Sequence, residues 1–85
     1  MSDYVEARYV KYVLRKAQFA EQEVASQLIN DLFRDLSLLQ TLSDAGQQTL
    51  TSIRLLSVSL SHGRSLHAYE WDAANNAAEA WCQAR

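Results

Sequence analysis

Proline is absent from this sequence, and glycine occurs only at Gly46 and Gly63. These two residue types are the strongest interrupters of regular secondary structure, so most of the chain has nothing to stop a helix once it has started. Alanine, leucine, glutamine, glutamate and arginine, which all favour helices, are abundant. The scarcity of breakers therefore predicts an all-α protein without a β-sheet.

Cysteine is nearly absent as well, because Cys82 is the only one. An intramolecular disulfide is therefore impossible, and no Cys/His cluster offers a structural zinc site. A single free thiol fits a reducing compartment, most simply the cytoplasm. Residues 1–6 lack the basic start and apolar run of a signal peptide, and no apolar run is long enough to span a membrane. We therefore expect a cytoplasmic protein with no membrane contact.

Signatures of catalysis are missing too. Two isolated glycines cannot build a phosphate-binding loop, no serine lies in a Gly-x-Ser-x-Gly elbow, and Cys82 has no histidine nearby in sequence. Cys82 is therefore predicted to be a small packing residue. These absences predict a protein that is not an enzyme and holds no cofactor.

A metal site has weak support. His62 and His67 are five residues apart, which places them off a common helix face, whereas metal-binding pairs are three or four apart. His67 and Glu70 have the right spacing, but a single pair is a weak signal. We expect no metal, and a metal-dependent activity in the interior of a helical bundle remains one alternative function.

Apolar residues recur at steps of three and four, which indicates helices rather than strands. In the first helix this apolar stripe runs through Val5, Tyr9, Tyr12/Val13, Ala17, Ala20, Val24, Leu28, Leu32, Leu36 and Leu39. Eighty-five residues make one domain, 1–85, and its helices are predicted at about 3–42, 44–62 and 65–84. Ser43 or Asp44 would cap the second helix, because short polar side chains accept hydrogen bonds from helix N-termini. Gly63 would close that helix in the left-handed conformation, and Ser65 would cap the third.

The first predicted helix raises a question of architecture. Residues 17–22 contain no breaker, so a break there is not predicted, and an unbroken helix of about 40 residues would be about 60 Å long. The chain would then be a helical hairpin or a small three-helix bundle. Because a long hairpin cannot enclose a core alone, we expect oligomerisation into a four-helix type of bundle.

Basic residues are concentrated near the N-terminus. The net charge of the chain is −2, which does not favour general binding of nucleic acid, but residues 1–20 carry four basic and two acidic side chains. Arg8, Lys11 and Arg15 are three and four residues apart and so share a helix face. Three tyrosines lie on adjacent faces: Tyr4, Tyr9 and Tyr12. This region is either an ordinary solvated face whose tyrosines belong to the core, or a surface for an acidic protein or for phosphates and bases.

The leucine-rich stretch from Leu28 to Leu60 is most simply core, but it could also bind an amphipathic helix of a partner. We predict a non-enzymatic interaction protein (a small regulator, adaptor, inhibitor or chaperone) that acts through helix–helix contacts with itself or with a helical partner. A small nucleic-acid-associated factor using the basic N-terminal helix is another alternative. The candidate partner-binding residues are Arg8, Lys11, Tyr12, Arg15, Leu28, Leu32, Phe33 and Leu36.

Overall fold

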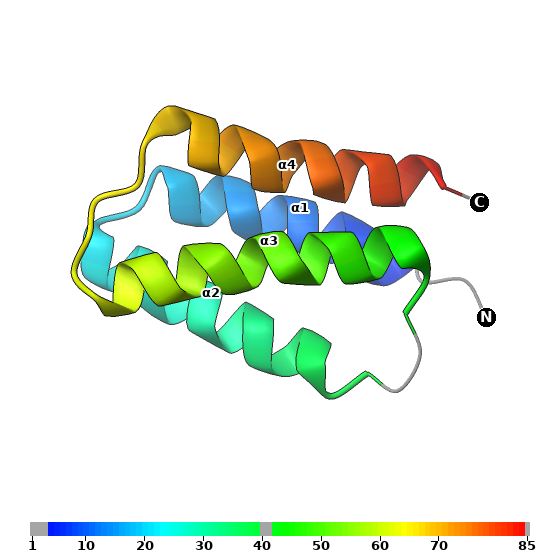
Figure 1. Ribbon diagram of the computed structural model, residues 1–85, viewed down its shortest axis with the longest axis horizontal. Coiled ribbons are helices and arrows are strands. Elements are labelled where there is room, and N and C mark those ends of the chain that lie inside the picture. The colour runs from blue at the N-terminus through cyan, green and yellow to red at the C-terminus, as the bar shows by residue number, and fades with distance from the viewer. Residues whose placement is uncertain (1–3, 40–41, 85) are drawn as a thin grey trace.

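Four helices form the bundle in the computed structural model, which describes residues 4–39 and 42–84. They are α1 (Tyr4–Gln18), α2 (Gln22–Ser37), α3 (Asp44–Ser61) and α4 (Ala68–Gln83). Each helix packs against its neighbour in the chain, and α4 returns alongside α1 to close the ring (Figure 1). The prediction of an all-α bundle is confirmed, and the described residues contain no strand. The described residues form four helices, however, rather than the two or three that were predicted.

The core lies along the axis of the bundle and receives side chains from every helix. Leu14, Ile29, Ile53 and Trp81 are among its largest fully buried members. Burying such a side chain stabilises the folded state by about 1.5–3 kcal/mol relative to exposing it. Cys82 is a buried free thiol in the same cluster, which confirms its predicted packing role. One chain thus builds a continuous four-helix core, so self-association is not needed to complete it.

The prediction of one helix over residues 3–42 is wrong between Gln18 and Gln22, where the chain turns back on itself. The N–H of Ala20 donates to the carbonyl of Ala17, which tightens the end of α1, and Glu21 is extended with φ −62° and ψ 155°. No proline or glycine is involved. Residue 3 and residues 40–41 of the predicted helix lie outside the described residues.

Burial provides the physical reason for this break. The buried residues of α1 end at Ala17, and those of α2 begin at Ala25, eight positions later. At 3.6 residues per turn, these two positions would lie about 80° apart around one continuous helix. A straight helix would therefore spread the buried positions over a wider arc than either stripe covers alone, whereas folding back places both stripes against one core. Tertiary burial outweighs local helix propensity here.

The ends of α3 follow the prediction. Ser43 is the N-cap, and its hydroxyl accepts a hydrogen bond from the N–H of Gly46 at 3.2 Å. At the other end Gly63 has φ +73°. The N–H of Gly63 donates to the carbonyl of Leu60, and the N–H of Arg64 donates to that of Ser59. This paired hydrogen bonding closes the helix and satisfies carbonyls that would otherwise lack partners.

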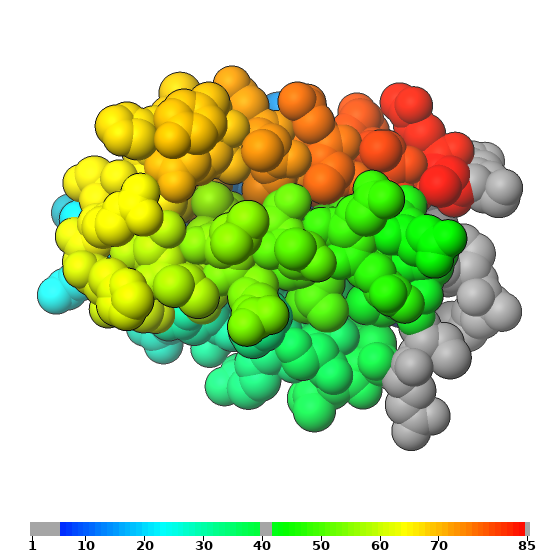
Figure 2. Space-filling view, viewed as in Figure 1, coloured from blue at the N-terminus to red at the C-terminus, as the bar shows by residue number. Residues whose placement is uncertain are grey.

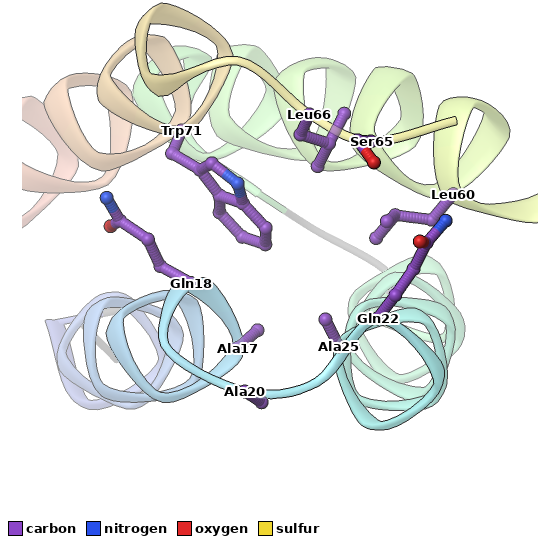
Figure 3. Close-up of a pocket in the computed structure, with 9 residues that line it drawn as sticks. All are labelled: Ala17, Gln18, Ala20, Gln22, Ala25, Leu60, Ser65, Leu66 and Trp71. Atoms are coloured by element: carbon purple, nitrogen blue, oxygen red, sulfur yellow. The ribbon is translucent and has the colours of Figure 1, made fainter. Parts of the chain in front are cut away.

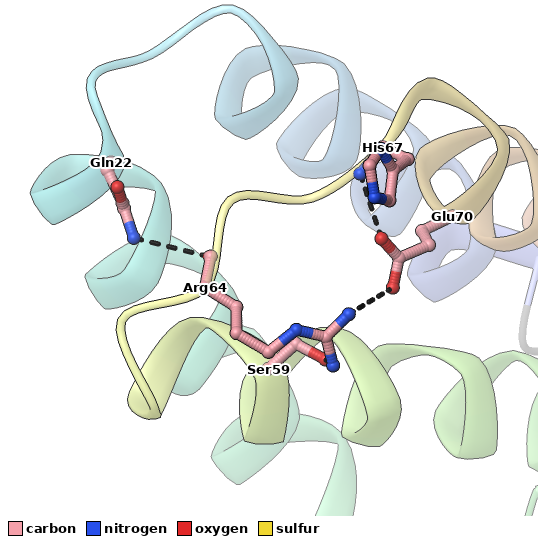
Figure 4. Close-up of polar contacts among 5 residues, drawn as sticks. All are labelled: Gln22, Ser59, Arg64, His67 and Glu70. Atoms are coloured by element: carbon pink, nitrogen blue, oxygen red, sulfur yellow. Dashed lines mark hydrogen bonds and ion pairs between the residues drawn. The ribbon is translucent and has the colours of Figure 1, made fainter.

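The start of α4 differs from the prediction, because its N-cap is His67 rather than Ser65. The Glu70 carboxylate accepts a hydrogen bond from the N–H of His67 at 2.8 Å, which fixes the first turn two residues later than expected. Arg64 extends this contact, since its guanidinium lies 3.7 Å from Glu70 and donates to the Ser59 hydroxyl (Figure 4). The Gln22 amide donates to the Arg64 carbonyl, so this cluster joins α2, α3 and α4.

Candidate functional site

The outer side of α1 gathers basic and aromatic side chains. The inner side is apolar and buried, so the polar and aromatic positions necessarily share the outer arc of the helix. We call the outer arc the basic–aromatic face. It consists of Arg8, Tyr9, Lys11, Tyr12, Arg15 and Lys16.

This face is strongly positive within an acidic chain. It carries four cations and no acid, whereas the whole chain has a net charge of −2, so the other residues together carry −6. The neighbouring helix α4 contains three acids and no lysine or arginine: Glu70, Asp72 and Glu79. Such separation of charge creates a local positive potential that attracts an anionic partner over roughly a Debye length, about 8 Å at physiological salt.

Two tyrosines of this face are exposed to solvent. Tyr9 is 53% exposed and Tyr12 is 64% exposed, so the prediction that placed them in the apolar stripe of the first helix is wrong. Val10, Val13 and Leu14 take the inner positions instead. Just beyond the end of α1, Phe19 is 81% exposed. Large, partly exposed aromatic rings provide contact area, and such side chains are frequent anchors in interfaces.

A cleft of about 210 Å³ lies between this face and α4. Its lining residues are Lys11, Tyr12, Arg15 and Asn75. Asn75 is held in place because its amide nitrogen donates to the Trp71 carbonyl at 2.9 Å and to the Gln18 side chain at 3.2 Å. The cleft therefore combines two cations with one amide that is fixed by its hydrogen bonds.

One ion pair borders the cleft. The Lys11 ammonium lies 3.0 Å from a carboxylate oxygen of Glu79, and both side chains are substantially exposed. Exposed pairs of this kind contribute about 0–1 kcal/mol, because water screens them and ordering two long side chains costs entropy. The pair can therefore exchange with another anion at little cost.

The four α2 residues that were predicted to bind a partner do not lie on the basic–aromatic face. Leu32 and Leu36 are buried in the core at 2% and 4% exposure, and Leu28 and Phe33 are half-buried against it. The structure therefore brings Arg8, Lys11, Tyr12 and Arg15 together on α1 but places the α2 residues inside the bundle. In this fold the leucine stripe serves the chain itself.

Two further hollows occur in the described part of the chain. A small one, of about 140 Å³, lies between the α1–α2 and α3–α4 connections, where the Trp71 indole points into the hollow toward Ala17 (Figure 3). An apolar groove of about 250 Å³ runs between α3 and α4 beside Leu55 and Tyr69. Figure 2 shows the surface on which α3 and α4 lie side by side; α1 is almost hidden in that view. Neither hollow concentrates charge.

The residues considered for a metal are engaged elsewhere. Glu70 binds the backbone of His67 and approaches Arg64, and the His67 ring stacks on Tyr69 with centroids 5.6 Å apart. Among residues 4–39 and 42–84, no group of three His, Cys, Asp or Glu side chains is placed to hold a metal ion. The carboxylates that a metal site near His67 would need from folding are not brought there.

Sequence reasoning missed the α4 side of the cleft. Asn75 and Glu79 lie more than 60 positions from Lys11 in the chain and become its neighbours only because α4 closes the ring beside α1. Nothing in the sequence positions of Asn75 and Glu79 indicated that they would lie near Lys11. The excess of acidic residues after residue 20 was the available indication that a complementary helix existed.

No family model, curated protein or solved structure matches this chain. Function therefore has to be argued from the molecule itself. No helix in the described part of the chain combines the length and the apolar character needed to cross a membrane.

Proposed function

We propose that this protein is a non-enzymatic interaction protein that binds an acidic helical segment of another protein through the basic–aromatic face. As a small regulator or adaptor it would act by occupying that segment. The single observation that supports this function is the collection of four cations and two exposed tyrosines on one side of α1 in a chain of net charge −2.

Physical complementarity favours an acidic helix over a neutral one. A partner with glutamates three and four residues apart would present a stripe of carboxylates to Arg8, Lys11 and Arg15, which repeat at the same spacing. Tyr9 and Tyr12 would pack against the aliphatic parts of that helix. Acids elsewhere on the chain would repel a polyanion that extends beyond α1, which favours a short protein segment over a long nucleic acid.

A cytoplasmic setting belongs to the same proposal. Cys82 is a buried, unpaired thiol, and a chain without a disulfide suits a reducing compartment.

The proposal is tested with two labelled peptides of about 20 residues, a length close to that of the helices typical of globular proteins. One is an amphipathic helix with glutamates on its polar side, and the other carries glutamine at those positions. Fluorescence anisotropy measures the affinity of each for the wild-type protein, for Arg8→Gln/Arg15→Gln, and for the matched control Arg34→Gln/Arg54→Gln, which removes two charges from α2 and α3.

The wild-type protein should bind the glutamate peptide and bind the glutamine peptide much more weakly. The α1 variant should lose about tenfold in affinity, equivalent to about 1.4 kcal/mol, and the control should lose less than about twofold. Equal losses in both variants would contradict a site on α1. Tighter binding to single-stranded DNA of the same length than to the peptide would replace the protein partner with nucleic acid.

A further inference from the structure

The cleft between α1 and α4 is lined by side chains that carry hydrogen-bond donors. Lys11, Tyr12 and Arg15 supply an ammonium, a phenol hydroxyl and a guanidinium, and Asn75 forms the opposite wall from α4. Both amide hydrogens of Asn75 are used by Trp71 and Gln18, so the donors left for a ligand are those of α1. A group that satisfies these donors must be an acceptor and is best an anion.

The size of the cleft limits the ligand. Sites for drug-sized molecules have volumes of about 300–1,000 Å³, and this cleft has about 210 Å³. It therefore suits one side chain with a carboxylate end rather than a cofactor. Arg15 is exposed and makes no hydrogen bond or ion pair with another described residue, so its guanidinium is available to such a group.

Lys11, unlike Arg15, already has an anionic partner, because a carboxylate oxygen of Glu79 lies 3.0 Å from its ammonium. An incoming carboxylate would meet the negative charge of Glu79 at the rim of the cleft. It would have to displace Glu79 from Lys11 or share the ammonium with it.

We propose that the cleft receives a carboxylate side chain of the acidic partner helix, and that Glu79 is an internal competitor that holds Lys11 in the unbound protein. This inference rests on the proposed function and assigns its specificity to one place on the surface. Glu79 makes partner binding less favourable, so the incoming carboxylate must also contact Arg15 to compensate for the displaced ion pair. Neutral segments cannot displace it, which improves discrimination.

The test compares Glu79→Gln with the control Asp72→Asn, using the labelled glutamate peptide described above. Both substitutions remove one negative charge from α4, and the two positions are seven residues apart, on the same side of that helix. Of these two acidic residues, only Glu79 forms an ion pair with Lys11. Glu79→Gln should bind the peptide about two- to fivefold more tightly than the wild type, the range expected for release of an exposed ion pair. Asp72→Asn should gain less than about 1.5-fold at physiological salt, because a more distant charge is screened.

A second comparison isolates the contact. In a Lys11→Gln background, Glu79→Gln should raise the affinity no more than Asp72→Asn does, since the ammonium for which Glu79 competes is gone. Equal gains from Glu79→Gln and Asp72→Asn in the wild-type background would overturn the competition while leaving the proposed function intact. Absence of peptide binding by every variant would overturn the proposed function, and this inference with it.

Discussion

At the scale of single residues, the connection between α3 and α4 depends on the backbone conformation of Gly63. Its φ of +73° lies in the left-handed region, which side chains with a Cβ atom disfavour. A Cβ added there would meet no atom within 4 Å, so the restriction comes from the backbone alone and not from crowding. The two hydrogen bonds that end α3 depend on this conformation.

Gly63→Ala should therefore lower the free energy of unfolding by about 1 kcal/mol, because alanine pays the cost of the left-handed conformation. Urea denaturation followed by circular dichroism measures this change. Gly63→Asn is the matched comparison, and it should lose less, because asparagine tolerates left-handed angles better than other side chains do. Equal stability of the alanine variant and the wild type would show that the connection does not require this conformation.

Local chemistry made some residues predictable and left others out of reach. Ser43 and Gly63 were predicted correctly, because capping depends on the residue itself and on neighbours a few positions away. Ser65 was an equally good candidate by type, but Glu70 reaches back to the N–H of His67 and moves the helix start. The start of α4 was therefore decided by a side chain on its own first turn and not by the type of the capping residue.

At the scale of helices, the junction between α1 and α2 determines the fold. Glu21 is extended with ψ 155°, and Gln22 is the first helical residue of α2. Proline is tolerated at the first position of a helix, because the N–H that proline lacks would have no partner within the helix there. The residue before a proline prefers extended backbone angles. Both conditions are met at Gln22.

Gln22→Pro should consequently change the free energy of unfolding by less than about 1.5 kcal/mol, the contribution of the lost hydrogen bond to Arg64. Gln22→Ala measures that bond separately. Gln27→Pro, at an exposed position inside α2, should cost about 3 kcal/mol or more, because it removes a helical hydrogen bond and introduces a clash. Chemical denaturation measures the free energy of unfolding of the three variants. Similar costs for proline at both positions would indicate a helix that runs unbroken through residue 22.

The sequence did contain a sign of this junction, although not one of composition. The residues that become buried before and after it follow two separate stripes, from Ala7 to Ala17 and from Ala25 to Leu36. Reading a single stripe through Tyr9, Tyr12 and Val24 joined the two and hid the change of phase. Local propensity could not reveal it, because the break is made by burial of both stripes in one core and not by any helix-breaking residue.

At the scale of the whole molecule, the arrangement of charge follows from the closing of the ring. The folded chain uses the leucines of α2 and α3 for its own core, except Leu55, which is 65% exposed. Assembly with another copy is therefore not required to build that core. On the outside, a positive helix face lies next to an acidic helix, with the Lys11–Glu79 pair between them. The basic stripe was predictable from the spacing of Arg8, Lys11 and Arg15. The α4 residues beside it could not be predicted from spacing, because only the folded bundle brings α4 next to α1.

The most direct test of the basic–aromatic face as the binding surface is a nuclear magnetic resonance titration of the isotope-labelled protein with the glutamate peptide. Backbone amide shifts should change along the outer side of α1 and at Asn75 and Glu79, and they should return toward the unbound positions as salt is added. Residues Leu55 and Tyr69, in the groove on the other side of α4, provide the internal control and should not move. Shift changes centred on that groove, or changes insensitive to salt, would contradict the account.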